Sequence, residues 1–210
     1  MNYKFAPALI TEKLSFLYDF IVNTVGTGVS LQKKTLGQLN AKDGESILDV
    51  GCGTGTFVIL AKNALLKSKI VGLDPDESVL KIAKKKAKIN KLNVKFVKSG
   101  AENLPFPDSS FNHVVSSLAF HHMPLEVKKK ALSEINRVLK PKGTFLLVDI
   151  GKPKNSFWQV IYGIESLIEV REYLSHNLKG KIPTLLEEAN FNVIESRKPY
   201  LGIYFWKATK

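Results

Sequence analysis

The chain has 210 residues, of which 44% are hydrophobic and 24% are charged, a composition that is typical of a globular protein and excludes a disordered or fibrous chain. Its single cysteine, Cys52, excludes an internal disulfide framework and a cysteine-based zinc cluster, and we expect no metal site. No run of about 18 apolar residues occurs and the N-terminus has no secretory pattern, so we expect a cytoplasmic protein without a membrane span.

The charge balance is strongly basic, with 31 basic against 19 acidic residues and a formal net charge of +12. A basic surface can bind nucleic acid, but Arg137, Arg171 and Arg197 are the only arginines, and arginine is the side chain that suits phosphate and base recognition. Lysine clusters at helical spacing predict solvated helix faces instead. These lysines are Lys81, Lys84, Lys85 and Lys88 on one helix and Lys128, Lys129 and Lys130 on another.

Hydrophobic spacing predicts the elements in chain order. Two helices come first, over about 9–21 and 31–39, and then short apolar strands alternate with helices. The strands are expected at 46–50, 70–73, 94–97, 113–117 and 144–150, the helices at 58–65, 76–90 and 125–139, and a turn at 141–143. A short helix at 183–189 and two strands at 192–197 and 202–208 follow. The alternation predicts a parallel sheet covered on both faces, and the closely spaced last strands predict antiparallel pairing.

These elements predict a single α/β domain over 1–210. An N-terminal helical cap would occupy 1–44 and a ligand-binding core 45–150. The segment 151–181 fits no strand of the alternation, so we expect an insertion there that covers the substrate. A C-terminal helix and hairpin would complete the domain over 182–210.

A glycine-rich turn, Asp49-Val50-Gly51-Cys52-Gly53-Thr54-Gly55, joins the first of these strands to a helix. Glycine lets a ligand approach the backbone, and the following helix offers free N–H groups. A dinucleotide fingerprint would need Gly or Ala where Thr56 stands, and no Walker lysine follows, so both of those sites are excluded. Asp74 ends the next strand about 20 residues further on, where a carboxylate can accept the hydroxyls of a ribose, and Asp76 remains to cap the next helix.

Together these residues resemble the class I S-adenosylmethionine-dependent methyltransferases, of the methyltransferase type 11 kind. The matching segments are the glycine turn, Gly72-Leu73-Asp74, Ala101-Glu102-Asn103-Leu104-Pro105-Phe106, Ser110-Phe111, Val114-Val115-Ser116-Ser117, His121-His122 and Leu139-Lys140-Pro141-Lys142-Gly143-Thr144. The order and spacing agree over about residues 45–150. More loosely, Tyr18-Asp19-Phe20 is similar to the branch of C-methyltransferases in ubiquinone and menaquinone biosynthesis.

The resemblance implies a Rossmann-like, mostly parallel seven-stranded sheet with an antiparallel last strand and helices on both faces. It implies S-adenosylmethionine as the cofactor and S-adenosylhomocysteine as the product. The implied cofactor-binding residues are Asp49, Gly51, Cys52, Gly53, Thr54, Gly55, Asp74, Pro75, Gly100, Ala101, Glu102 and Ser117. Asp49 would hold the amino group, Asp74 the ribose and Ala101 the adenine edge, while Ser117 would close the methionyl end. The family often has an acid where Gly100 stands, so a side-chain acceptor for the adenine amino group is missing from that position.

Two histidines are candidates for the chemistry. Methyl transfer is an in-line displacement, so alignment supplies much of the catalysis and a general base is the main further need. His121 and His122 follow the fourth core strand at the carboxyl edge of the sheet, where open α/β folds bind ligands. Alternatively, one of them packs under the loop and the other caps the next helix. No further ligands accompany them as a metal pair.

The acceptor is narrowed by exclusion. Cys52 lies inside the cofactor loop, so it is poorly placed as the covalent nucleophile of an enzyme that methylates a carbon of a nucleic-acid base. Enzymes that methylate an amino group of a base have an Asn/Asp-Pro-Pro-aromatic signature, but this chain has Ser116-Ser117-Leu118-Ala119 at that position. A small organic acceptor, aromatic or quinone-like, is therefore the leading hypothesis. An RNA methyltransferase with a lysine-rich surface and a non-catalytic cofactor-binding scaffold subunit remain as alternatives, and the sequence does not decide between a monomer and a homodimer.

Aromatic residues before and after the core are candidates for the acceptor site. Tyr18 lies in the N-terminal cap, and Trp158 and Tyr162 lie in the insertion. Aromatic walls suit an apolar or ring-bearing ligand. The same residues could instead seal the insertion onto the core, since Trp and Tyr are usually partly buried in either case.

Overall fold

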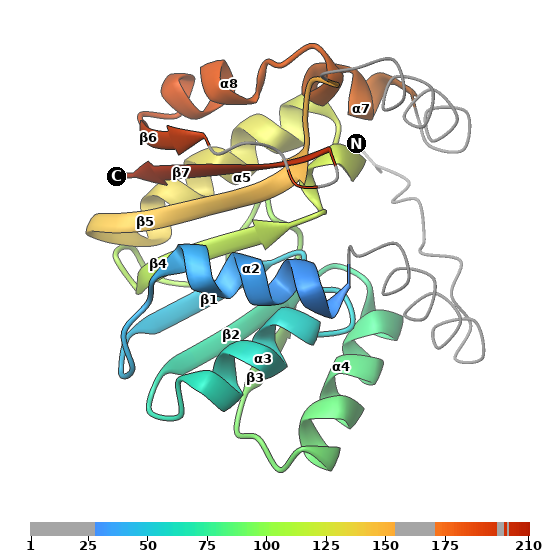
Figure 1. Ribbon diagram of the computed structural model, residues 1–210, viewed down its shortest axis with the longest axis vertical. Helices are drawn as coiled ribbons and strands as arrows, with labels where there is room; N and C mark the ends of the chain where they lie inside the picture. Colours follow the sequence, from blue (N-terminus) through green and yellow to red (C-terminus); the bar gives the residue numbers. More distant parts are fainter. Residues whose placement is uncertain (1–27, 154–170, 197–199, 201) are drawn as a thin grey trace.

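The computed structural model describes residues 28–153, 171–196, 200 and 202–210, and these residues form a single seven-stranded sheet with helices on both faces (Figure 1). The strands are β1 (Ser46–Val50), β2 (Lys69–Asp74), β3 (Lys95–Lys98), β4 (Phe111–Ser117), β5 (Leu139–Ile150), β6 (Asn192–Ser196) and β7 (Ile203–Thr209). Their order across the sheet is β3-β2-β1-β4-β5-β7-β6.

The pairing directions confirm the predicted fold class. All pairs among β1 to β5 are parallel, whereas β7 runs antiparallel to both β5 and β6. Helical connections produce the parallel pairs β1–β2, β2–β3 and β4–β5, because a strand must return to the same edge before it can pair in parallel. The predicted C-terminal hairpin is thus the last two strands of the sheet, and it forms one of its ends.

The helices cover the two faces in sequence order. One face carries α2 (Val29–Leu39), α3 (Thr56–Ala64) and α4 (Glu77–Ile89), and the other carries α5 (Leu125–Val138) and α8 (Ile182–Glu188) (Figure 1). A 3-10 turn, η1 (Phe120–His122), precedes α5, and α7 (Arg171–Leu178) packs against it. Each face has its own buried apolar cluster, so the sheet separates two cores.

Helix boundaries and buried faces agree with the spacing in the sequence. The apolar residues at helical spacing in α5, Ala131, Leu132, Ile135 and Val138, are at most 2% exposed. Helix α4 begins directly after Asp76, whose Oδ1 accepts a hydrogen bond from the Ser78 N–H at 2.7 Å, as the predicted cap requires. The helix predicted at 9–21 and most of the insertion lie outside the described residues.

Two expectations are wrong. The predicted turn at 141–143 lies within β5. Phe111 of β4 pairs with Leu139 and His113 pairs with Thr144, so the extra residues of β5 between these two pairs form an irregularity within the strand. Lys128 does not lie on a solvated face: it is fully buried because α7 covers this part of α5. The lysines at 81, 84, 85 and 88 of α4 are exposed, as predicted.

No helix among the described residues is long and apolar enough to cross a membrane. Within the same part of the chain, no three His, Cys, Asp or Glu side chains are grouped so that they could hold a metal ion.

Candidate functional site

The carboxyl ends of the parallel strands meet at one edge of the sheet, and the glycine turn lies there between β1 and α3. The N–H groups of Gly51 and Cys52 both donate to the carbonyl oxygen of Leu73, at 2.8 and 3.0 Å. These bonds tie the turn to the end of β2, so the turn and Asp74 form one unit. In open α/β sheets this edge is where ligands bind.

The three glycines of the turn are required for different reasons. All have positive φ, but a Cβ at Gly51 would collide with the side chain of Ala119, and a Cβ at Gly55 would lie 2.9 Å from that of Ala83. At Gly53 a Cβ would meet nothing within 4 Å. Packing within the protein therefore explains Gly51 and Gly55, whereas Gly53 borders open space that a bound molecule can fill.

Asp74 holds the turn in place through both carboxylate oxygens. Oδ2 accepts from the Gly53 N–H and Oδ1 from the Asp76 N–H, each at 2.9 Å. Burial raises the pKa of Asp74, and these backbone hydrogen bonds oppose that shift. A carboxylate has about four acceptor positions, so two remain for the hydroxyls of a ligand.

Asp49 and Cys52 belong to the glycine turn and have buried side chains. Asp49 is 2% exposed, and burial together with the nearby charge of Asp74 raises its pKa to about 8. A cationic ligand at this position would stabilise the ionised form. Burial and the same two carboxylates raise the pKa of the Cys52 thiol well above its usual value, which agrees with the expectation that Cys52 is no nucleophile.

The loop after β3 carries the candidates for the adenine side. Ala101 is buried, and Glu102 is exposed. A Cβ built at Gly100 would lie 2.6 Å from the carboxyl carbon of Glu102, so this side chain folds back over Gly100. The missing acid at Gly100 is visible in the sequence, but only the structure shows that Glu102 brings a carboxylate to the same place. Of the remaining candidates, Thr54 accepts a hydrogen bond from Nζ of Lys86 at 3.0 Å, and Pro75 is half-buried.

Ser117 ends β4 beside the turn. Its Oγ accepts a hydrogen bond from Nε2 of Gln32 on α2 at 3.1 Å. Gln32 was not a candidate from the sequence, because no motif marks it and its partner lies 85 residues away.

The two candidate histidines differ in their surroundings. The His121 ring is 8% exposed, and its Nδ1 lies 2.6 Å from Oδ1 of Asp149, which is fully buried on β5. His122 is exposed, and its ring centroid lies 4.0 Å from that of His121. The structure thus singles out His121 as half of a buried His–Asp pair. The signal for Asp149 in the sequence was an acid near the carboxyl end of an otherwise apolar strand.

Asp149 is held in its ionised form. Burial alone would raise its pKa, but the charge and hydrogen bond of His121 and the N–H of Ile150, which donates to Oδ1 at 2.7 Å, outweigh burial and lower it. The Lys128 ammonium adds to this effect. A carboxylate that stays ionised fixes the proton of His121 on Nδ1, so Nε2 is the basic nitrogen of this ring.

Lys128 connects this pair to α7. Its Nζ donates to the carbonyl oxygen of Tyr173 at 2.6 Å and to Oδ1 of Asn177 at 2.7 Å, and burial lowers its pKa to about 8. Asn177 in turn donates from Nδ2 to the carbonyl oxygen of Ile150 at 3.0 Å. The insertion therefore ends in a helix that is bonded to the strand carrying Asp149.

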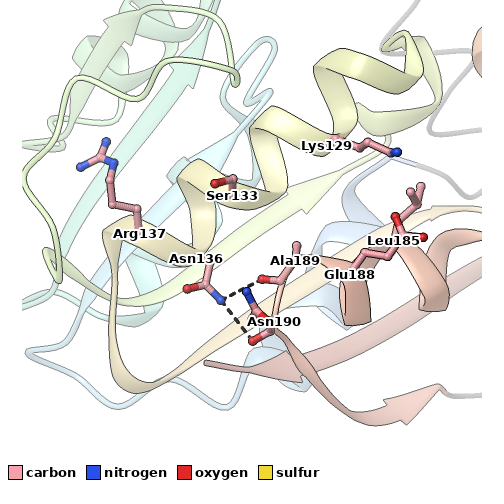
Figure 2. Close-up of a pocket in the computed structure, with 8 residues that line it drawn as sticks. All are labelled: Lys129, Ser133, Asn136, Arg137, Leu185, Glu188, Ala189 and Asn190. Carbon is pink, nitrogen blue, oxygen red and sulfur yellow. Dashed lines mark hydrogen bonds between the residues drawn. The ribbon is translucent and has the colours of Figure 1, made fainter.

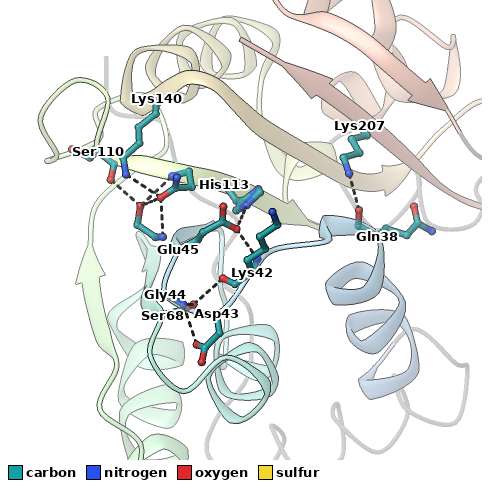
Figure 3. A network of polar contacts seen from close by, with 12 residues as sticks. Gln38, Lys42, Asp43, Gly44, Glu45, Ser68, Ser110, His113, Lys140 and Lys207 are labelled. Atoms are coloured by element: carbon teal, nitrogen blue, oxygen red, sulfur yellow. Dashed lines mark hydrogen bonds and ion pairs between the residues drawn. The ribbon is translucent and has the colours of Figure 1, made fainter.

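Polar groups at the opposite edge of the sheet have structural roles. Figure 3 shows Nε2 of His113 pointing at Oε2 of Glu45, 2.9 Å away, while Glu45 also accepts from the Lys42 N–H. This network joins the amino ends of β1 and β4, far from the glycine turn. It contains a second His–acid pair, but none of the candidate cofactor-binding residues.

A cavity of about 490 Å³ lies between α5 and α8 (Figure 2). Asn136 spans it and donates to the carbonyl oxygens of Ala189 and Asn190. Helix α5 runs back from the carboxyl edge, so this cavity lies toward the amino ends of the strands. None of the candidate cofactor-binding or catalytic residues, all of which are described, lines it. Tyr18, Trp158 and Tyr162 lie outside the described residues.

Comparisons with known proteins identify relatives along most of the chain. A family model described as a methyltransferase domain matches residues 47–143. A demethylmenaquinone methyltransferase of Staphylococcus haemolyticus is 30% identical over 209 residues, which cover 90% of this chain and 86% of that protein. The protein of the same name from Listeria welshimeri is 31% identical over 157 residues, and the match spans 73% of this chain and 66% of the relative's length.

A solved structure has the same fold. The crystal structure of a putative methyltransferase from Bacillus halodurans has a TM-score of 0.66 and 26% identity to this chain, with 85% of this chain and 94% of that chain covered.

Proposed function

Because the chain belongs to the class I S-adenosylmethionine-dependent methyltransferases, we propose that it methylates a ring carbon of a small quinone-like acceptor in its hydroxyl-bearing, reduced form. The relatives named demethylmenaquinone methyltransferase support this class of acceptor. The quinone-biosynthesis resemblance of Tyr18-Asp19-Phe20 supports the same branch.

The residues at the carboxyl edge fit the cofactor of this family. Gly53 borders open space, so a ligand can contact the protein backbone there. Asp74 retains acceptor positions for the ribose hydroxyls of the cofactor. The buried carboxyl group of Asp49 suits a positively charged ligand, and Glu102 would accept from the adenine amino group in place of the missing acid at Gly100. When bound, S-adenosylmethionine supplies a methyl group on a positively charged sulfur.

His121 and Asp149 would provide the base. With Nδ1 bonded to Asp149, Nε2 of His121 takes the proton from a ring hydroxyl of the acceptor. The electron pair left on that oxygen makes the neighbouring ring carbon nucleophilic, and this carbon bonds to the methyl group as the methyl–sulfur bond breaks. The methylated carbon then loses its own hydrogen as a proton to solvent, which restores the aromatic ring as an oxyanion. The ring oxygen takes the proton back from Nε2 of His121, and this returns the imidazole to its neutral form.

The observation that carries the proposed mechanism is the 2.6 Å contact between His121 and Asp149 at the same edge as the glycine turn. Asp149 stabilises the imidazolium that forms and keeps the ring oriented, as in other His–Asp pairs. Ala119, two residues before His121, packs against Gly51, so the pair and the turn lie on adjoining segments of one site.

The test is a methylation assay with a matched control. Purified protein is incubated with methyl-labelled S-adenosylmethionine and a short-chain demethylated naphthoquinol, and the product is identified by mass spectrometry. Asp149→Asn should lower kcat by about 10²- to 10⁴-fold, which is the range that a positioned base supplies. Glu45→Gln, which alters the His–acid pair at the opposite edge, should leave kcat unchanged.

Two outcomes would contradict this function. Labelling of RNA but of no quinol would favour the RNA methyltransferase. Tight cofactor binding without turnover of any quinol, in protein that is fully folded, would favour the scaffold subunit.

A further inference from the structure

Gln32 carries a buried polar atom that no group in the described part of the chain satisfies. Its Nε2 donates to Oγ of Ser117 at 3.1 Å, but its Oε1 is buried and has no hydrogen-bond partner in the described part of the chain. Buried side-chain oxygens nearly always accept a hydrogen bond, because an unpaired one loses its water without replacement. The unpaired oxygen therefore needs a donor that the described residues do not supply.

Gln32 lies above the junction of β4 and the glycine turn. Asp49 pairs with Val115 across β1 and β4, so Ser117, two residues further on, lies opposite Gly51. The Oγ of Ser116 donates to the carbonyl oxygen of Val50 at 2.7 Å, which holds these two strand ends together. Helix α2 crosses this part of the sheet in Figure 1.

The strand order determines which end of a cofactor would reach Gln32. Along the carboxyl edge, Glu102 follows β3, Asp74 ends β2, the glycine turn follows β1 and Ser117 ends β4. A ligand whose adenine lies near Glu102 and whose ribose lies near Asp74 reaches β4 with its amino-acid end. The donor at that end of S-adenosylmethionine is an ammonium group.

We propose that Gln32 binds the α-ammonium group of S-adenosylmethionine, with Oε1 as the acceptor and Ser117 as the residue that orients the amide. The proposal rests on the cofactor placement above and not on the identity of the methyl acceptor. The contact lies on a part of the cofactor that does not react, so it binds substrate and product cofactor equally.

Calorimetric binding to Gln32→Met tests this directly, without any methyl acceptor. The variant should bind S-adenosylmethionine and S-adenosylhomocysteine about ten- to a hundredfold more weakly, which is the loss expected for a hydrogen bond to a charged group. Methylthioadenosine, which lacks the amino-acid end, should bind with unchanged affinity. Gln38→Met on the same helix is the matched control and should bind all three like the wild type.

A second variant tests the direction of the hydrogen bond. It also tests the proposal if Gln32→Met proves unstable. Gln32→Glu keeps an acceptor oxygen and adds a negative charge, so it should bind S-adenosylmethionine at least as tightly as the wild type. A clearly weaker affinity would mean that the amide donates to the cofactor carboxylate, and it would overturn the proposal. Unchanged S-adenosylmethionine binding by Gln32→Met, or equal weakening of methylthioadenosine, would also overturn it.

Discussion

Replacing Gly53 by alanine separates the ligand role of the glycine turn from its role in folding. Both Gly53 and Gly44 have positive φ, and a Cβ at either position meets nothing within 4 Å. Gly44, however, lies in the turn before β1, at the opposite edge of the sheet (Figure 3). Both alanine variants therefore place a side chain at a positive φ, +50° at Gly53 and +96° at Gly44, so the control carries at least as much backbone strain. Only Gly53→Ala places a methyl group in the proposed cofactor space.

The sizes of the effects follow from the geometry. A left-handed conformation costs a non-glycine residue about 1–2 kcal/mol. A domain of this length loses about 2–4 °C in Tm per kcal/mol of destabilisation, so Gly53→Ala and Gly44→Ala should each melt about 2–8 °C below the wild type. Gly51→Ala also places a side chain at a positive φ, and its methyl group collides with Ala119. The collision adds about 1–3 kcal/mol of overpacking, so the Tm of this variant should fall by about 4–20 °C.

Thermal unfolding with and without cofactor measures both effects. At a cofactor concentration of about 100 times Kd, binding stabilises the folded protein by about 2.7 kcal/mol, which raises Tm by about 5–10 °C. The wild type and Gly44→Ala should show this increase, and Gly53→Ala should lose it. A full increase in Gly53→Ala would refute the assignment of this space to the cofactor. A Gly51→Ala variant as stable as Gly44→Ala would refute the packing argument.

Three further predictions concern charged side chains. The pKa of Asp49 is about 8, so below that pH Asp49 must release a proton when a cation binds. The affinity for S-adenosylmethionine should therefore rise by up to about tenfold per pH unit until pH 8. Calorimetric titrations in buffers of different ionisation enthalpy would measure the proton release. Asp74→Ala should weaken cofactor binding by about 1–3 kcal/mol in calorimetry and also lower Tm, because the Gly53 N–H loses its acceptor. Burial lowers the pKa of Lys128 from 10.5 to about 8, so between about pH 8 and pH 10.5 the native state binds fewer protons than the unfolded chain. The free energy of unfolding should therefore rise with pH between these two values. In urea denaturation, Lys128→Met should lack this rise and Lys129→Met should keep it.

Local patterns in the sequence determined most of the fold. The alternation of apolar strands and helices, the glycine turn with Asp74, and the Asp76 cap each depend on residues close together in the chain, where periodicity and turn chemistry act. The antiparallel last strands were predictable for the same reason, since two strands joined by a short connection pair as a hairpin. The predicted turn at 141–143 is instead an irregularity within β5, because Leu139 and Thr144 on either side of it both pair with β4.

Only the tertiary structure decided which side chains meet. His121 and Asp149 are 28 residues apart in sequence, Lys128 and Asn177 are 49 apart, and Gln32 and Ser117 are 85 apart. Sequence spacing carries no signal for such pairs, because they form only when the strand order places β1, β4 and β5 side by side and α2 and α7 cover their carboxyl ends. The same packing buried Lys128, whose sequence neighbours marked it as a surface residue, because burial depends on what lies opposite a helix and not on the helix alone.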